Sequence, residues 1–431
     1  MIDQRIRTTV ANGYIHEKLK NPVVCVIGLG YVGLPLASEF CSHYKVIGFD
    51  INEHRVEELN RHNSIHNFQI SSNPDLIAQA DFIVITVPTP ITESKEPDLS
   101  YVTYAARTIS QNMKHDCTVI LESTVYPGVT EDILKPILEE SGLQCGKDFR
   151  LAYSPERINP GDEIHSLYNV VKVVSGMDED TTELVSQFYS KVCKEVYKAV
   201  NIKTAEAAKV IENIQRDINI ALVNEFSLIF DKIGLNTRDV LDAASTKWNF
   251  YRCFPGLVGG HCIPVDPYYL VYKAKELGYN PQAILMGRNI NDYMSIHVAQ
   301  LAIKGLNQTG KVIKGSKVLI MGLAYKENVP DTRETPSKEV IKELNNYGVN
   351  VYGYDPLLNN IEKEFHIEEV PNFECLTDID CVILNANHNV FRQITLSDLK
   401  TIMNNDPLMI DVHRYFDETA AKELGFYYKS L

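Results

Sequence analysis

A glycine-rich turn after an apolar run places the strongest restriction on the fold of this chain. Residues 23–27 read VVCVI and stop at Gly28, and a helical pattern begins after Gly33. Gly30 lies between them in the sequence GLGYVG. In such a turn the first glycine permits a tight bend, the second lets a ligand approach the backbone, and the third lets helix and strand pack closely. The turn therefore predicts a βαβ unit with a buried parallel strand.

An acidic residue follows at the distance that a dinucleotide site requires. Asp50 ends the next apolar run, twenty residues after Gly30. Its carboxylate can accept hydrogen bonds from a ribose, and it would repel the 2′-phosphate of NADP. The amides at the helix N-terminus attract a pyrophosphate. These features predict an NAD site, with a purely structural glycine turn as the alternative.

The rest of the chain indicates two α/β regions around a helical middle. Residues 204–233 contain neither Pro nor Gly and carry apolar residues at helical spacing, which predicts one long amphipathic helix ended by Gly234. Further strand-like runs occur at 46–50, 82–87, 119–121, 150–153, 170–174, 318–322, 349–355, 381–384 and 408–411. We expect an α/β fold of two Rossmann-like doubly wound domains, joined by the long helix and a helical middle domain.

The length of 431 residues suits two or three domains. We place an N-terminal NAD-binding domain at 1–203, a central helical and dimerisation domain at 204–310, and a C-terminal Rossmann-like domain at 311–431. The central part contains the sequence GGHCIPVD at 259–266. A loop of small and helix-breaking residues can hold the thiol of Cys262 close to a ligand, although a buried, inert cysteine is the alternative.

Composition excludes several classes of protein. Hydrophobic residues make up 45% and charged residues 23%, as in globular domains, and the net charge of −14 disfavours nucleic-acid and anionic-membrane partners. No apolar stretch has the length of a transmembrane helix, and the first twenty residues show no secretory signal. Nine cysteines without a C-x-x-C pair indicate reduced thiols, no zinc site and a cytoplasmic location.

Seven motifs in a fixed order resemble one enzyme family. They are GLGYVGLP (28–35), VPTP (87–90), ESTVYPG (122–128), YSPERINPGD (153–162), AEAAKVIEN (205–213), GGHCIPVDPYYL (259–270) and YKENVPDTRET (325–335). They are spread across nearly the whole chain, and together they resemble the UDP-glucose/GDP-mannose dehydrogenase family. GGHC in place of GGSC, with PERINPGD and KWNF, is most similar to the branch that oxidises UDP-GlcNAc or UDP-GalNAc for capsule or O-antigen polysaccharides.

The resemblance implies a four-electron oxidation of the sugar C6 alcohol to a carboxylate, with two NAD⁺ consumed. Cys262 would form a thiohemiacetal and then a thioester, which water hydrolyses. Lys209 and Asn213 match family residues that stabilise the oxyanion at C6. Asp266 and Thr124 match residues that order water or shuttle protons, and Glu156 is a candidate general base.

Without the resemblance, the helix pattern favours a surface Glu206–Lys209 pair beside a solvated Asn213. Glu156, Asp266 and Thr124 would each be read as a loop cap or surface residue. The family match also assigns ligand contacts. It implies NAD contacts by Gly28, Gly30, Tyr31, Val32, Gly33, Asp50, Arg55, Thr89, Thr124 and Arg333. It implies UDP-sugar contacts by Glu156, Arg157, Lys209, Asn213, Gly259, Lys326 and Arg414. The family further implies a homodimer and an active site that closes between the two α/β domains.

Three positions depart from the UDP-glucose pattern. Pro160 replaces a second Glu, which puts a two-Glu scheme of water activation in doubt, Val265 replaces a Lys, and His261 replaces a Ser. His261 and Pro160 count against UDP-glucose 6-dehydrogenase without excluding it. It stays as an alternative together with UDP-ManNAc dehydrogenase, and the C4 epimer of the sugar stays open. A simple two-electron hydroxy-acid dehydrogenase has no use for Cys262. A non-catalytic nucleotide-sugar sensor would need no nucleophile.

Overall fold

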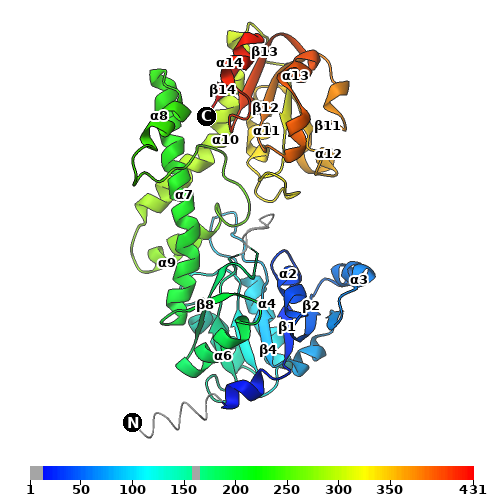
Figure 1. The fold of residues 1–431 in the computed structure, drawn as a ribbon, viewed down its shortest axis with the longest axis vertical. Helices are drawn as coiled ribbons and strands as arrows, with labels where there is room; N and C mark the ends of the chain where they lie inside the picture. The colour runs from blue at the N-terminus through cyan, green and yellow to red at the C-terminus, as the bar shows by residue number, and fades with distance from the viewer. Residues whose placement is uncertain (1–12, 158–165) are drawn as a thin grey trace. The chain divides into compact units, whose positions relative to one another are not determined.

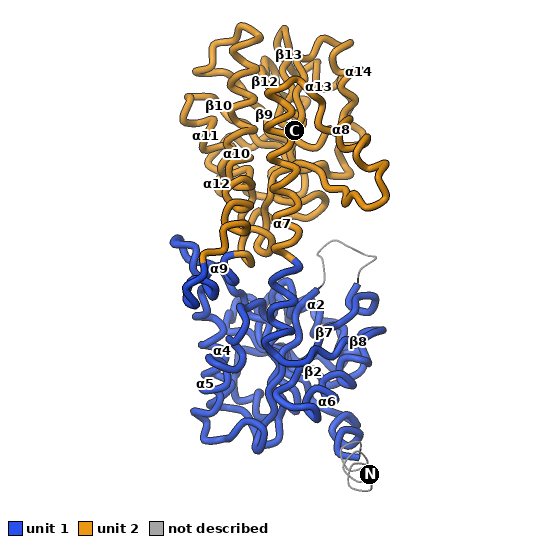
Figure 2. Tube along the Cα trace, turned by 90° about the vertical axis from the view of Figure 1, so that its left-hand side faces the viewer, with its two compact units in different colours: residues 1–212, 268–279 blue, residues 213–267, 280–431 orange. Residues whose placement is uncertain are grey.

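The computed structural model describes residues 13–157 and 166–431, so Pro160 lies outside the described residues. The chain forms two compact units (Figure 2). The first comprises Met1–Glu212 and Tyr268–Tyr279, and the second comprises Asn213–Pro267 and Asn280–Leu431. The division by packing thus falls within the segment that we assigned to the central domain, and the three predicted domain boundaries stay a prediction.

The first unit, in which Figure 1 labels β1, β2, β4 and β8, is built on a sheet. The described part of the chain forms eight strands in it, in the order β3-β2-β1-β4-β5-β6-β7-β8. All neighbouring strands are parallel except β6 and β7. The strands are β1 (Val23–Ile27), β2 (Lys45–Phe49), β3 (Phe68–Ser71), β4 (Phe82–Ile85), β5 (Thr118–Leu121), β6 (Arg150–Tyr153), β7 (Val171–Gly176) and β8 (Glu195–Lys198). The short polar edge strands β3 and β8 are absent from the sequence-based prediction because they lack a long apolar run.

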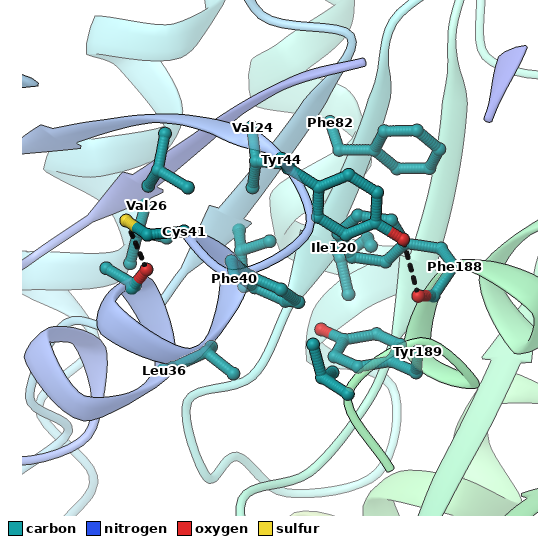
Figure 3. Close-up of a cluster of buried hydrophobic side chains, with 14 of the residues drawn as sticks. Val24, Val26, Leu36, Phe40, Cys41, Tyr44, Phe82, Ile120, Phe188 and Tyr189 are labelled. Carbon is teal, nitrogen blue, oxygen red and sulfur yellow. Dashed lines mark hydrogen bonds between the residues drawn. The ribbon is translucent and has the colours of Figure 1, made fainter. Parts of the chain in front are cut away.

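Helices follow most of these strands. They are α2 (Gly33–Phe40), α3 (Glu53–His62), α4 (Ser100–Asn112), α5 (Lys135–Glu139), α6 (Glu179–Tyr189) and α9 (Asp266–Glu276), with a 3₁₀ helix at Pro74–Gln79 and a π-helical turn at Thr130–Leu134. Aromatic rings from α2, α6 and β4 fill the core between helix and sheet (Figure 3). Phe82 and Phe188 stack with centroids 4.2 Å apart, and Tyr44 donates a hydrogen bond of 3.0 Å to the Phe188 carbonyl.

The second unit contains a parallel sheet in the order β11-β10-β9-β12-β13-β14. Its strands are β9 (Lys317–Met321), β10 (Asn350–Tyr354), β11 (Glu368–Glu369), β12 (Ile379–Leu384), β13 (Met403–Asp411) and β14 (Tyr427–Ser430). Its helices are α8 (Thr237–Ala244), α10 (Gln282–Gln308), α11 (Ser337–Asn346), α12 (Ile361–Phe365), α13 (Leu396–Ile402) and α14 (Glu418–Glu423), with one-turn helices at Phe373–Cys375 and Asn389–Gln393. The predicted fold class, two Rossmann-like regions with a helical middle, is confirmed.

The long helix is also confirmed. It is α7 (Ile202–Ile233), and it ends at Gly234, which has a φ of +75°. A positive φ is readily available to glycine and terminates the helical path. The change from the first to the second unit falls inside this helix, between Glu212 and Asn213. Among the described residues, no helix has the length and apolar character needed to cross a membrane.

Candidate active site

The glycine turn has the geometry that a dinucleotide requires. Gly28 has a φ of +93°, and a Cβ on Gly33 would lie 1.9 Å from the Gly28 carbonyl oxygen. Helix α2 can therefore approach β1 only without a side chain at position 33. A Cβ on Gly30 would meet nothing within 4 Å, so space is open beside this turn. The residues present fit a pyrophosphate above the N-terminus of α2.

Asp50 joins the turn to the end of β2. One carboxylate oxygen accepts a hydrogen bond of 2.8 Å from the Leu29 amide, and the other accepts one of 2.9 Å from the Asn52 amide. Each oxygen keeps a further lone pair for a ribose hydroxyl. The other predicted NAD contacts of the first unit lie on separate elements. Tyr31 is exposed and Val32 precedes α2, while Thr89 is half-buried after β4. Arg55 pairs with Glu58 at 3.0 Å on the surface of α3.

The segment after β5 carries Thr124, and a side chain of α7, Glu206, holds this segment in place. Thr124 is half-buried, and Ser123 donates a hydrogen bond of 2.7 Å to the Val87 carbonyl. Glu206 is fully buried and accepts hydrogen bonds from the Gly128 amide and from the amide and hydroxyl of Thr130. The alternative of a surface Glu206–Lys209 pair is therefore wrong, because the Glu206 carboxylate is occupied inside the first unit.

Glu156 and Arg157 follow β6. Glu156 is largely buried, with 9% of its surface exposed. Arg157 donates to the Val171 carbonyl at 2.7 Å and forms a two-pronged ion pair with Glu212 at 2.7 and 3.4 Å. Because its guanidinium is engaged by protein groups, Arg157 acts in this structure to hold the chain after β6.

Lys209 and Asn213 lie four residues apart on α7, and both are largely buried. The predicted alternative of a solvated asparagine is therefore wrong. The Asn213 amide donates a hydrogen bond of 2.5 Å to Asp266, the first residue of α9. The Cys262 carbonyl accepts hydrogen bonds from the amides of Val265 and Asp266, at 3.1 and 2.8 Å. Asn213 and the turn that carries the partly exposed Cys262 are thus linked through Asp266.

The two glycines before the cysteine pack against residues 325–336. A Cβ on Gly259 would lie 2.6 Å from the Pro336 ring, and one on Gly260 would lie 2.7 Å from the Tyr325 ring. The Gly260 amide also donates to the Glu334 carbonyl at 3.3 Å. The motifs GGHC and YKENVPDTRET, far apart in sequence, therefore meet within the second unit.

A buried polar network holds Gly256, which lies just before the loop that carries Cys262. The sequence motifs did not predict this network. The Asn224 side chain forms two hydrogen bonds with the backbone of Gly256, of 2.9 and 3.0 Å, and a third with Asn291. Asn291 donates to Asp217, which pairs with the buried Arg288. The available signal was a pair of polar residues, Asp217 and Asn224, seven positions apart on one face of a helix otherwise lined by apolar residues.

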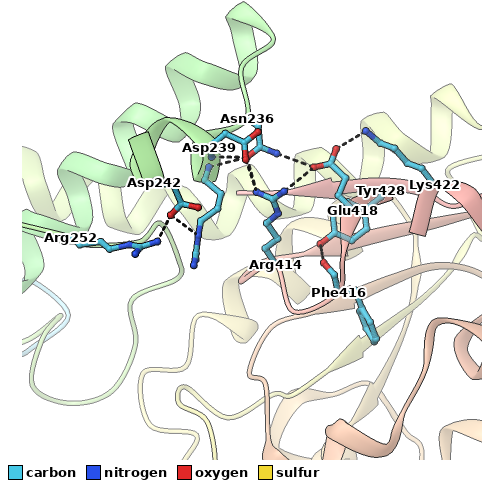
Figure 4. Close-up of polar contacts among 10 residues, drawn as sticks. Asn236, Asp239, Asp242, Arg252, Arg414, Phe416, Glu418, Lys422 and Tyr428 are labelled. Carbon is cyan, nitrogen blue, oxygen red and sulfur yellow. Dashed lines mark hydrogen bonds and ion pairs between the residues drawn. The ribbon is translucent and has the colours of Figure 1, made fainter. Parts of the chain in front are cut away.

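The predicted cations of the second unit are engaged in ion pairs or half-buried. Lys326 is half-buried in the loop after β9, and Arg333 pairs with Asp331. Arg414 has a φ of +54°, donates to Asn236 at 2.8 Å and lies 3.7 Å from Glu418 (Figure 4). Asn236, Arg414 and Glu418 line an open pocket of about 580 Å³. The substrate role of Arg414 stays a prediction, and acidic neighbours surround it.

Comparisons with known proteins cover most of the chain. Residues 23–67 and 62–201 match the NAD binding domain of the UDP-glucose/GDP-mannose dehydrogenase family. Residues 203–293 match its central domain, and residues 319–418 match its UDP binding domain. The chain is 46% identical to Protein CapL of Staphylococcus aureus, over 90% of this chain and 98% of that protein.

A second relative has a named activity. The UDP-N-acetyl-D-glucosamine 6-dehydrogenase of Salmonella typhi is 42% identical, over 90% of this chain and 95% of that protein. Among solved structures, the UDP-D-ManNAc dehydrogenase of Pyrococcus horikoshii matches with a TM-score of 0.85 at 29% identity, over 95% of this chain and 98% of that one. The chain therefore belongs to the UDP-glucose/GDP-mannose dehydrogenase family and is an NAD-dependent oxidoreductase that acts on a nucleotide sugar.

Proposed function

We propose that this enzyme oxidises a UDP-N-acetylhexosamine, UDP-GlcNAc or UDP-GalNAc, from the C6 alcohol to the carboxylate. The observation that carries the oxidation at Cys262 is the hydrogen bond between Asn213 and Asp266, which links the α7 residues to the turn of Cys262, and the choice of sugar rests on the relatives. The relatives in Salmonella typhi and Pseudomonas aeruginosa, 42% and 41% identical, are named UDP-N-acetyl-D-glucosamine 6-dehydrogenases. The product uronic acid would supply capsule or O-antigen polysaccharide.

The turn at Gly28–Gly33 and Asp50 would hold NAD⁺, which supplies the hydride acceptor for both oxidations. We further assign cofactor contacts to Tyr31, Val32, Arg55, Thr89, Thr124 and Arg333, and sugar-nucleotide contacts to Arg157, Gly259, Lys326 and Arg414. Four of the assigned arginines form ion pairs with carboxylates in this structure, so ligand binding would exchange or share these pairs. They are Arg55, Arg157, Arg333 and Arg414.

Cys262 supplies the covalent step. Its sulfur adds to the C6 aldehyde carbon, and the oxygen takes a proton, which gives a thiohemiacetal. Lys209 and the Asn213 amide donate to the C6 oxygen. Asn213 uses its second N–H for this contact, because its first N–H is bonded to Asp266. Oxidation of that carbon gives a thioester. Water then attacks the carbonyl carbon, the C–S bond breaks, and the acid and the Cys262 thiol are released.

Glu156 acts as the base for this water, and Asp266 and Thr124 order water or pass protons. A general base must lie within hydrogen-bond reach of the proton that it abstracts. The position of Glu156, largely buried three residues after the end of β6, supports this role.

Each alternative substrate differs from UDP-GlcNAc in a single substituent of the sugar ring. UDP-ManNAc is favoured by relatives such as the UDP-N-acetyl-D-mannosamine dehydrogenase of Methanococcus vannielii, 34% identical to this chain. UDP-glucose lacks the 2-acetamido group. A non-catalytic sensor would bind these nucleotides without producing NADH, and the buried Lys209 and Asn213 speak against it, since binding alone needs no oxyanion donors.

NADH formation with UDP-GlcNAc, UDP-GalNAc, UDP-ManNAc and UDP-glucose tests the proposal, with Cys262→Ser as the matched variant. We expect the highest kcat/KM with UDP-GlcNAc or UDP-GalNAc and two NADH per sugar, with turnover lost in Cys262→Ser. One NADH per sugar would overturn the thioester mechanism. Preference for UDP-ManNAc or UDP-glucose would overturn the substrate assignment alone.

We also propose that a second copy of the chain covers α7. Leu222, Ile229 and Ile233 are exposed on this helix at spacings of seven and four residues, which places them on one face. Trp248, in the segment after α8, is 91% exposed. A large exposed apolar surface is typical of an oligomer interface.

A further inference from the structure

A buried ion pair lies beneath the segments that carry Thr124 and Glu156. Glu122 follows β5 directly, and Lys172 is the second residue of β7. Both residues are 0% exposed, and Lys172 Nζ lies 2.9 Å from Glu122 Oε2. Tyr189, at the end of α6 in the core shown in Figure 3, donates its hydroxyl to the other oxygen of Glu122.

Stability alone is a weak reason for such a pair. Taking two charges out of water costs several kcal/mol per ion, and apolar residues of similar volume are often as stable or more stable. The following residues of β7, Val173 and Val174, are buried without any polar group. A lysine in this otherwise apolar run therefore calls for another explanation.

Lys172 and its neighbour hold the chain on both sides of Glu156. The Lys172 ammonium donates a hydrogen bond of 3.1 Å to the Pro155 carbonyl, which belongs to the peptide bond preceding Glu156. The residue after Glu156, Arg157, donates to the Val171 carbonyl at 2.7 Å. Two consecutive residues of β7 thus fix the backbone that orients the Glu156 carboxylate.

The backbone of Glu122 and the hydroxyl of Ser123 hold the other segment. The Glu122 amide donates to the Ile85 carbonyl at 2.9 Å, and Ser123 donates to the Val87 carbonyl at 2.7 Å. Thr124 is the next residue. One ammonium group therefore connects the chain after β5, which carries Thr124, to the chain after β6, which carries Glu156. Burial raises the pKa of Glu122, the Lys172 ammonium opposes this shift, and the Glu156 carboxylate adds to it, so Glu122 senses both neighbours.

We propose that Lys172 and Glu122 are positioning residues for thioester hydrolysis, because they place Glu156 and Thr124 for the attack of water. The proposal rests on the proposed function, in which Glu156 takes a proton from water as the C–O bond forms and the C–S bond to Cys262 breaks. Neither residue is expected to contact the substrate. The direct contact of Lys172 is with the Pro155 carbonyl, so the main effect is expected on the step in which Glu156 acts.

The test is a rapid-mixing measurement of NADH with Lys172→Met. Both oxidations precede hydrolysis, so slow hydrolysis gives a burst of two NADH per active site, followed by a slow steady state. We expect the burst to keep this amplitude and the steady rate to fall at least tenfold, since small misplacements of a catalytic group have effects of this size. Mass spectrometry of the stopped reaction should detect the acyl group on Cys262.

Two further variants separate positioning from folding. Glu122→Gln/Lys172→Met leaves no unpaired charge and should recover stability without recovering hydrolysis, because the Pro155 carbonyl still lacks its donor. Lys198→Met removes a partly exposed lysine, paired with Glu183, from neighbouring β8 and should behave as wild type. A burst that falls in proportion to the steady rate, or hydrolysis at the wild-type rate in the double variant, would overturn the positioning role.

Glu156→Gln distinguishes this inference from the proposed function on which it rests. If Glu156→Gln also gives a full burst and a slow steady state, the base is correctly assigned and Lys172→Met decides the positioning role. If Glu156→Gln turns over at the wild-type rate, Glu156 is not the base and the positioning role fails with it, whereas the oxidation itself is judged by the two NADH per sugar. If only Lys172→Met is normal, the positioning role alone is wrong.

Discussion

At the residue scale, Glu206 holds the chain that follows Thr124. Its carboxylate is fully buried and accepts three hydrogen bonds from Gly128 and Thr130. Burial raises the pKa of Glu206 to about 7, although the donors from Gly128 and Thr130 oppose the shift. The side chain therefore changes its charge near neutral pH, inside the first unit.

This pKa predicts a pH-dependent stability. Because the folded pKa lies above the unfolded value, the contribution of Glu206 is full below about pH 4.5 and is lost as the pH rises through about 7. The loss is at most about 3 kcal/mol. Urea unfolding at pH 5, 6, 7 and 8 should show wild type losing stability relative to Glu206→Gln across this window. A constant difference between the two proteins would contradict the assigned pKa.

Asp50 makes a second prediction at this scale. Its carboxylate accepts amide hydrogen bonds from Leu29 and Asn52 and carries the charge that would repel a 2′-phosphate. In Asp50→Asn we expect the kcat/KM ratio of NAD⁺ to NADP⁺ to fall about tenfold or more, corresponding to roughly 1.4 kcal/mol. Steady-state kinetics with both cofactors would measure it. An unchanged ratio would show that Asp50 serves the turn alone.

At the scale of elements, two glycines in the turn between β1 and α2 have different roles. Gly33 allows the helix to pack, and Gly30 leaves room for the ligand. Gly33→Ala would place a Cβ 1.9 Å from the Gly28 carbonyl, whereas Gly30→Ala meets nothing within 4 Å. We expect Gly33→Ala to lower the melting temperature and abolish NAD⁺ binding. Gly30→Ala should keep the melting temperature and weaken NAD⁺ binding, because its methyl group occupies the ligand side. Thermal melting and calorimetric titration of NAD⁺ together distinguish the two, and equal stability losses would refute the difference.

The contact between α7 and the cysteine loop gives a second prediction. Asn224→Ala removes three hydrogen bonds and leaves the buried amide and carbonyl of Gly256 unpaired. We expect a loss of about 2–3 kcal/mol of stability and a lower kcat. Gln215→Ala, an exposed change on the same helix, is the control for helix propensity. Chemical unfolding of both variants measures the difference, and a loss equal to that of Gln215→Ala would show that the loop does not depend on Asn224.

At the scale of the whole molecule, the exposed apolar face of α7 predicts self-association. In Leu222→Glu/Ile229→Glu, two carboxylates on this face should convert a dimer to a monomer in analytical ultracentrifugation, because burying them at an interface costs several kcal/mol. The chain has a single tryptophan, Trp248, so its emission reports directly on whether a partner covers the segment after α8. A wild-type monomer at micromolar concentration would refute the dimer.

Local pattern was sufficient for the turn at Gly28–Gly33, the interior strands and α7. In each case the deciding interactions lie within a few residues, as with the apolar run VVCVI and the uninterrupted helical spacing after Ile202. The edge strands β3, β8, β11 and β14 were not predicted. They are short and mixed in polarity, and pairing with a neighbouring strand, rather than their own sequence, makes them strands.

The sequence by itself determined the family, the cofactor and the identity of the candidate nucleophile, because these depend on residue types at fixed short spacings. Only the tertiary structure decided which charges are buried. It placed Glu206 against Gly128, Lys172 against Glu122, and the glycines before Cys262 against Tyr325 and Pro336. These partners are 50 or more residues apart. Their contacts arise from the order of strands and the packing of helices, and no local periodicity encodes that order.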